Sequence, residues 1–316
     1  MAEPTRITSV QNSRVKAVTR LLREHKERRT TGRFVAEGSR QIQRALAAGL
    51  RLCEVYECVS LPRGEDVIVW PEDESFLYFE VSEQVMGKMA YRENPETLLA
   101  VFAQPEPRWS LKSFVIPSRG AGNSPSNSGG GGNSGGDSGA YDAAKTAATG
   151  DSGGNSGGGK EFWLVMVGTT KPGNLGAMAR TAAAAGVTGV IVADAVVDAL
   201  NPNAIHASTG AVFSLPILAG TTEEILAFLD RRNVRILATV VGATQNYTQV
   251  DLTGSVALVI GAEDTGLDER WRQAAEAHGA CVMIPMADSA VDSLNAANAA
   301  AIVLFEAVRQ RRLVRC

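Results

Sequence analysis

Hydrophobic and polar residues follow two different patterns along the chain, and the first of them fills the N-terminal hundred residues. Apolar side chains recur there at helical spacing from Asn12 to about Arg29. Similar signals predict helices at Ser39–Ala48, which Gly49 would end, and at Ser82–Met89, and strands at 34–38, 52–59, 66–70, 76–81 and 97–102. Strands and helices that alternate over so short a stretch indicate a small α/β domain.

The second pattern begins near residue 161, where the apolar runs are more continuous. They predict strands at 162–167, 189–193, 234–241, 256–260 and 281–284, and helices at 176–185, 222–232, 268–277 and 293–311. Continuous apolar strands that alternate with helices are typical of a mostly parallel sheet covered on both faces. Ligands bind such sheets in the loops at the carboxyl ends of the strands.

Between these two regions the composition changes abruptly. Of the 40 residues from Gly120 to Gly159, 15 are glycine and 7 are serine. Such a segment cannot bury enough apolar surface to offset the entropy lost on ordering. We therefore predict a first domain at residues 1–107, a flexible Gly/Ser-rich linker at 108–160 and a second domain at 161–316.

The net charge of −3 does not point to a nucleic-acid ligand, but the distribution of charge does. Residues 1–35 carry nine basic and three acidic side chains, a local charge of 9 − 3 = +6. A cationic element can attract a phosphate backbone even in a slightly acidic protein, although a solvated basic helix face fits equally well. The candidate RNA-binding side chains are Arg14, Lys16, Arg20, Arg23, Arg28 and Arg29.

Other features of the sequence argue against several classes of protein. No apolar run reaches the roughly 18 residues that span a bilayer, and no signal peptide is visible, so we expect no membrane partner. Four cysteines without a C-x-x-C pair suit a reducing cytoplasm. The three histidines are not spaced with cysteines or carboxylates as metal ligands would be, so we expect no catalytic metal.

Two loops that follow predicted strands carry candidate chemistry. The loop after the strand at 162–167 is rich in glycine but matches neither the dinucleotide-binding nor the P-loop pattern. Its Asn174 could simply cap a helix, whereas Arg180 on an otherwise apolar helix face needs a partner. The loop after 256–260 reads Gly261-Ala-Glu263-Asp-Thr-Gly266-Leu, and its glycines would let the backbone approach a ligand closely, unless they only form a turn.

A third loop runs from Ile284-Pro-Met286 to Ser293-Leu-Asn295, where Ser293 is also a competent helix N-cap. In order along the chain, N-x-G-x-x-x-R, G-x-E-x-x-G-L and I-P-M…S-L-N resemble the three signature motifs of the SpoU/TrmH family. This family of the SPOUT superfamily contains RNA 2′-O-ribose methyltransferases. Residues 1–107 resemble, less specifically, the L30e-like substrate-binding domain that many ribosomal-RNA members carry.

The resemblance implies S-adenosylmethionine as cofactor, a deep trefoil knot in the second domain and a homodimer formed through that domain. It also implies roles for individual residues. Because a guanidinium is effectively always protonated, we expect Arg180 to act as an electrostatic anchor in preference to a base. The implied catalytic residues are Arg180, Asn174, Glu263, Ser293 and Asn295. The implied cofactor-binding residues are Thr239, Gly261, Ile284, Met286 and Leu294.

The function expected from the resemblance is methyl transfer to a ribose 2′-hydroxyl, with 23S-type ribosomal RNA favoured by the additional N-terminal domain. A transfer-RNA 2′-O-methyltransferase and a non-catalytic RNA-binding protein of the same fold are the alternatives. A Rossmann-type enzyme is disfavoured because no G-x-G-x-x-G opens a βαβ unit. The S-L-N motif together with Arg180 speaks against methylation of a base nitrogen.

Overall fold

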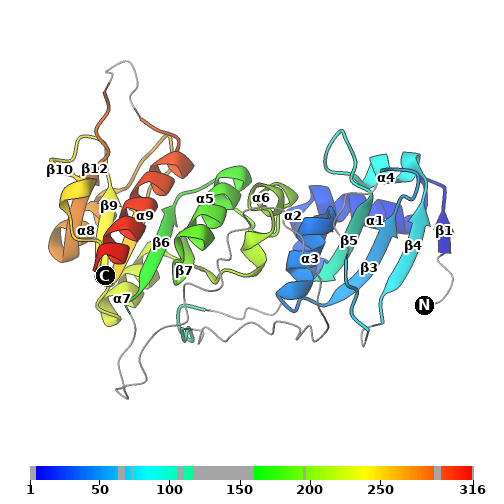
Figure 1. Ribbon diagram of the computed structural model, residues 1–316, viewed down its shortest axis with the longest axis horizontal. Coiled ribbons are helices and arrows are strands. Elements are labelled where there is room, and N and C mark those ends of the chain that lie inside the picture. The colour runs from blue at the N-terminus through cyan, green and yellow to red at the C-terminus, as the bar shows by residue number, and fades with distance from the viewer. Residues whose placement is uncertain are drawn as a thin grey trace, which may run out of the picture. The chain divides into compact units, whose positions relative to one another are not determined.

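A computed structural model describes residues 5–62, 68–72, 75–104, 110–116, 160–194, 197–287 and 293–314. The described residues form a five-stranded sheet and a seven-stranded sheet, and each sheet is built from one side of the Gly/Ser-rich tract (Figure 1). Most of the predicted linker, residues 117–159, lies outside the described residues. None of the helices in the described ranges combines the length and hydropathy needed to cross a membrane.

The five-stranded sheet carries helices on both faces. Its strands are β1 (Thr5–Ile7), β2 (Arg33–Glu37), β3 (Leu52–Glu57), β4 (Leu77–Val81) and β5 (Leu98–Ala103), and its helices are α1 (Ser13–Arg23), α2 (His25–Thr31), α3 (Ser39–Ala47) and α4 (Glu83–Met89). The strand order is β1-β4-β3-β5-β2, in which β5 is antiparallel to both of its neighbours. Alternation along β2 sends Val35 into the core under α1 and α4, and Phe34 and Ala36 into the core under α3.

The prediction of a single helix from Asn12 to Arg29 is wrong, because the helix is interrupted at Glu24. This residue has extended backbone angles, φ −115° and ψ 114°, between α1 and α2. The side chain of Arg28 then folds back and donates to the carbonyl oxygens of Leu21 (2.6 Å) and Leu22 (3.4 Å). Carbonyls in the last turn of a helix have no partner within the helix, so Arg28 caps α1.

The seven-stranded sheet is parallel throughout its described pairings. Its strands are β6 (Phe162–Val167), β7 (Gly189–Ala193), β8 (Ile217–Gly220), β9 (Arg235–Thr239), β10 (Gln245–Asn246), β11 (Val256–Ile260) and β12 (Gly279–Met283). Its helices are α5 (Pro172–Ala185), α6 (Pro202–Ala207), α7 (Thr222–Arg231), α8 (Glu269–His278) and α9 (Ala296–Leu313), with 3₁₀ turns at Ala211–Phe213 and Tyr247–Gln249. The strand order is β10-β12-β9-β11-β6-β7-β8.

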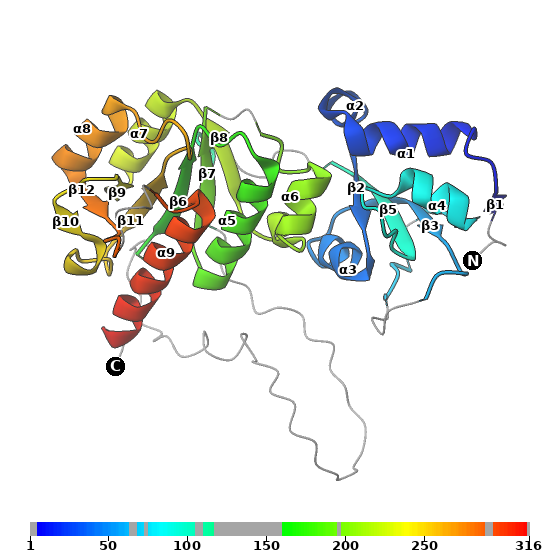
Figure 2. The same cartoon turned by 90° about the horizontal axis from the view of Figure 1, so that it is seen from above.

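The order of the strands reverses its direction next to β6. From β6 the chain moves to β7 and β8 on one side, and then returns past β6 to β9, β11 and β12 on the other. Right-handed crossovers in opposite directions put their helices on opposite faces, so α5 and α9 cover one face and α7 and α8 the other (Figure 2). The predicted parallel sheet with helices on both faces is confirmed. The carboxyl ends of β6 and β11 lie side by side at this reversal, where α/β sheets bind ligands.

Several boundaries in this second region differ from the sequence prediction. Helix α5 begins at Pro172, one turn before the predicted Gly176, because proline suits the first turn of a helix. Helix α9 begins at Ala296, capped by Asn295 and not by Ser293. The short elements α6, β8 and β10 have no counterpart in the prediction. In the N-terminal region, the described part of the predicted strand at 66–70 is not a strand. The knot stays a prediction.

Candidate active site

The carboxylate of Glu263 joins the three loops that carry the motifs. Asn174, in the first turn of α5, donates from Nδ2 to Glu263 Oε1 over 3.0 Å. Asn295, which precedes α9, donates to the same oxygen, and Lys171 pairs with Oε2. Side chains from the loops after β6, β11 and β12 therefore meet at one carboxyl group.

The partners of Glu263 favour the ionised form of its carboxyl group. The hydrogen bonds from Lys171 and Asn174 lower the pKa of the Glu263 carboxyl below its ordinary value, and the carboxylate in turn raises the pKa of Lys171. An ionised carboxylate only accepts hydrogen bonds, so both asparagines turn their NH₂ groups toward it. The other end of Asn295 is also fixed, because its Oδ1 accepts from the backbone N of Ala297 over 2.9 Å. The site is therefore an oriented set of amides around a fixed negative charge.

A cavity of about 310 Å³ adjoins Glu263. Its wall consists of the ends of β9, β11 and β12 and the segments that follow them, with one residue of α8 and the start of α9, and most of the lining residues are apolar. Such a size and such a lining are typical of sites for small organic ligands and cofactors. All five predicted cofactor-binding residues line it, as do two predicted catalytic residues: Thr239, Gly261, Ile284, Met286 and Leu294, with Glu263 and Ser293.

Gly261 has a different reason to be glycine from the one expected. A Cβ at this position would stand 2.4 Å from the backbone carbonyl carbon of Gly266. The loop can therefore close on itself only if residue 261 has no side chain. Gly266 itself has a φ of +65°, in the left-handed region that favours glycine. Gly261 still lines the cavity, but the close approach that it permits is that of its own loop.

Thr239 also contributes less polarity than its hydroxyl suggests. Its Oγ1 donates to the carbonyl oxygen of Val259 over 2.9 Å, which uses the hydroxyl proton within the sheet. Leu294 is half-buried and Met286 is 39% exposed, so these two side chains form part of the wall and of the rim. The cavity therefore offers mainly shape and apolar surface.

Arg180 is not brought to the Glu263 carboxylate. It lies six residues beyond Asn174 on α5, about 9 Å further along the helix axis. Its side chain is exposed, and it forms no hydrogen bond or ion pair within the described ranges. Of the five predicted catalytic residues, Asn174, Glu263 and Asn295 are thus joined by hydrogen bonds, whereas Arg180 is not part of this cluster.

The predicted RNA-binding residues divide into an exposed and a buried set. Lys16, Arg20, Arg23 and Arg29 are exposed on α1 and α2, whereas Arg14 is partly buried and pairs with Glu54 over 3.1 Å. Arg28 is 2% exposed, and besides capping α1 it pairs with Asp198 over 2.8 Å. The prediction that Arg28 contacts RNA is therefore wrong, because its donors are used inside the protein.

Two further cations at the site were not predicted from the sequence. Lys171 is the partner of Glu263, and its place directly before the Pro-Gly-Asn174 turn was the only signal that could have revealed it. Arg272 of α8 lines the cavity. It is one of several charged residues on a mostly exposed helix, so nothing in the local pattern distinguishes it.

Comparison with known proteins decides the family. The model of the SpoU rRNA methylase family matches residues 161–305, and that of the MRM3-like substrate-binding domain matches residues 12–100. A solved RNA 2′-O ribose methyltransferase is 34% identical with a TM-score of 0.72, over 98% of this chain and 100% of that chain. The chain belongs to the SpoU rRNA methylase family. The resemblance seen in the three motifs is thereby confirmed.

Other SpoU proteins agree with this assignment. The AviRb methyltransferase of Streptomyces viridochromogenes, solved with AdoMet, is 25% identical with a TM-score of 0.71, over 96% of this chain and 99% of that chain. A 23S rRNA (uridine(2479)-2′-O)-methyltransferase of the same organism is 39% identical over 45% of this chain and 50% of the relative. The 23S rRNA (guanosine-2′-O-)-methyltransferase RlmB of Escherichia coli K12 is 40% identical over 48% and 60%. The matches thus span 50% and 60% of these two curated relatives.

Proposed function

We propose that this SpoU protein is an S-adenosylmethionine-dependent methyltransferase that acts on a ribose 2′-hydroxyl of 23S-type ribosomal RNA. The observation that carries the proposal is the convergence of three motif loops on Glu263 beside a cavity of about 310 Å³. Polar groups at the edge of an apolar cavity suit a reaction between a bound cofactor and an incoming polymer, because one reactant is enclosed while the other approaches from solvent.

The cavity fits the cofactor that the proposal requires. S-adenosylmethionine, when bound, supplies a methyl group on a positively charged sulfur. Ile284, Leu294 and Met286 would hold it against the loop that contains Gly261. Because these side chains are apolar, they would not oppose the loss of positive charge from the sulfur.

The protein's own side chains would act by orientation and by charge. Asn174 and Asn295 are fixed through Glu263, and they can align a ribose with the cavity. Orientation of two reactants can contribute roughly 7–11 kcal/mol to a barrier. Arg180 is exposed and has no partner in the described ranges, so it is available to an RNA phosphate, and as a permanently protonated group it would act as an electrostatic anchor. Ser293 lines the same cavity and would contribute a hydroxyl.

The substrate class follows from the N-terminal region and from the relatives. A substrate-binding-domain model covers residues 12–100, and the two curated relatives named above are 23S rRNA methyltransferases. The exposed cations Lys16, Arg20, Arg23 and Arg29 would supply a sequence-independent grip on phosphates. We further propose the domain boundaries 1–107 and 161–316, a homodimer formed through the second region, and action in the cytoplasm, where ribosomal RNA is found.

The test combines cofactor binding with methyl transfer by the purified full-length chain. Calorimetry should detect S-adenosylmethionine binding without added metal, and labelled methyl groups should appear at alkali-resistant positions of ribosomal RNA. The absence of binding at millimolar cofactor would refute the enzyme proposal. Methylation of transfer RNA alone would overturn the substrate assignment, and binding without transfer to either RNA would leave an RNA-binding protein. Sedimentation equilibrium tests the dimer.

A further inference from the structure

The cavity beside Glu263 contains one positive charge that the proposed chemistry does not use. Its charged lining residues, within the described ranges, are Glu263 and Arg272. The charge of Glu263 is matched by Lys171 and by two amides, whereas Arg272 forms no ion pair with any described residue. The wall therefore presents an uncompensated guanidinium to whatever the cavity binds.

The position of this guanidinium is held by a single hydrogen bond. Arg272 Nε donates to the carbonyl oxygen of Leu267 over 3.2 Å, and Leu267 is itself a lining residue next to Gly266. A guanidinium has five N–H donors, and within the described residues the other four have no partner. Arg272 is thus oriented by the loop after β11 while most of its donors stay available.

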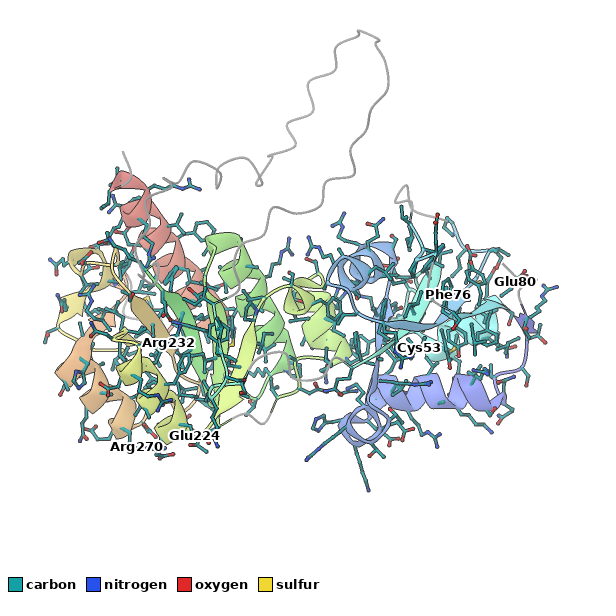
Figure 3. The ribbon with its side chains drawn as sticks, turned by 90° about the horizontal axis from the view of Figure 1, so that it is seen from below. Cys53, Phe76, Glu80, Glu224, Arg232 and Arg270 are labelled. Atoms are coloured by element: carbon teal, nitrogen blue, oxygen red, sulfur yellow. The ribbon has the colours of Figure 1, made fainter. Side chains whose placement is uncertain are left out.

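Arg270, on the same helix, shows that this arrangement is specific to position 272. It lies two residues earlier, on the other side of α8. There it pairs with Glu223 of α7 and, over 2.6 Å, with Asp268 (Arg270 is labelled in Figure 3). The charge of Arg270 is therefore neutralised at the surface, whereas that of Arg272 borders the cavity.

We propose that Arg272 binds the carboxylate of the amino-acid part of the cofactor. This inference rests on the proposed function, because S-adenosylmethionine carries three charged groups, a sulfonium, an ammonium and a carboxylate. A cationic wall would repel the first two, so its natural counterpart is the carboxylate. Arginine and carboxylate form charge-assisted, often bidentate hydrogen bonds, and the Nη groups are the donors that remain for them.

The test compares ligands that differ only in the carboxylate. Calorimetry of the full chain with S-adenosylmethionine and with decarboxylated S-adenosylmethionine separates that group from the rest of the ligand. Arg272→Gln should weaken S-adenosylmethionine binding roughly tenfold, as expected when one charge-assisted hydrogen bond is removed. The same variant should bind the decarboxylated ligand as well as the wild type does, or more tightly. Arg272→Lys, which keeps the charge but not the forked set of donors, should recover part of the affinity.

Arg270→Gln is the matched control, since it removes the same charge from the same helix and should leave both affinities unchanged. An equal decrease in affinity for both ligands in Arg272→Gln would overturn the inference, because Arg272 would then only support the Leu267 loop. A lysine variant as weak as the glutamine variant would also overturn it. If the wild type bound neither ligand, the proposed function itself would fail, which is a distinguishable result.

Discussion

The two ends of this chain use charge in different ways. At the carboxyl edge of the seven-stranded sheet, Lys171, Asn174 and Asn295 converge on the single carboxylate of Glu263, although Lys171 lies 92 positions away from it in the sequence. On α1 and α2, by contrast, most of the cations point into solvent, and Arg28, which does converge with other groups, is buried and serves the fold.

The difference shows what catalysis and attraction each require. A reaction needs groups held in a fixed mutual geometry, which parallel strands provide by bringing their loops to one edge. Attraction of a phosphate backbone needs only a local excess of positive charge, and it tolerates mobile, solvated side chains. We therefore expect substitutions at the sheet edge to alter rate, and those on the basic helices to alter RNA affinity.

The largest effect is expected from Arg180→Ala. If Arg180 stabilises charge at the RNA during transfer, kcat should fall by roughly 10²–10³-fold, whereas cofactor affinity and Tm should stay unchanged because the side chain is exposed. Single-turnover methyl transfer measures the first effect, and calorimetry and thermal unfolding measure the others. Arg231→Ala, an exposed arginine on α7, is the control. Full activity in the Arg180 variant would remove it from the mechanism.

Glu263→Gln should have the next largest effect. The new amide keeps the shape but lacks the charge that orients Asn174 and Asn295, so kcat should fall by roughly 10–100-fold. Asp264→Asn is the matched control, because this neighbouring carboxylate bonds only to the backbone N of Thr265 among the described residues. Steady-state kinetics on both variants tests this view, and equal behaviour of the two would contradict a special role for Glu263.

Neutralising the exposed basic face should weaken RNA binding without slowing the bound reaction. With Lys16, Arg20, Arg23 and Arg29 changed to glutamine, the slope of log affinity against log salt should become shallower by roughly 0.7 for each phosphate that is no longer neutralised. Fluorescence anisotropy across a salt series measures this slope. An unchanged slope would show that these cations form only a solvated surface.

Arg28→Gln provides the contrast to those four substitutions. It removes the donor to Asp198 Oδ2 and to the carbonyl oxygens of Leu21 and Leu22, so the free energy of unfolding should fall by roughly 2–3 kcal/mol. The salt dependence of RNA binding should not change. Denaturant unfolding measures the loss of stability, and RNA-binding anisotropy across a salt series measures the slope. A shallower slope in this variant would restore Arg28 as an RNA contact.

The smallest effect is expected from Lys171→Met, and it concerns pH. Lys171 lowers the pKa of Glu263, so the carboxylate that orients the amides persists as pH falls below the ordinary range. Without Lys171 this pKa should rise toward its ordinary value, and activity should decline at a higher pH during acidification. The acid limb of the kcat profile measures the shift. Lys160→Met serves as control. If the acid limbs of the wild type and of both variants coincided, the ion pair between Lys171 and Glu263 would not set the pH dependence of activity.

Much of the second region could be predicted from the sequence. Strands β6, β7 and β11 have the predicted bounds, because fully buried strands appear as uninterrupted apolar runs whatever surrounds them. The motif loops were placed correctly at the ends of their strands for the same reason. The short elements β8 and β10 were not predicted, since four- and two-residue strands are stabilised by neighbours and not by any local period.

The sequence by itself determined which residues form most of the strands and helices, and that three polar loops follow strands of one sheet. Only the tertiary structure decided that Glu263 meets Asn174 and Asn295, that Arg28 is buried and that Arg272 borders the cavity. The physical reason is that local patterns record the period of each element, whereas partners are chosen by strand order. Asn174 and Glu263 stand 89 positions apart in the sequence and meet because β11 pairs with β6, an adjacency that no local signal encodes.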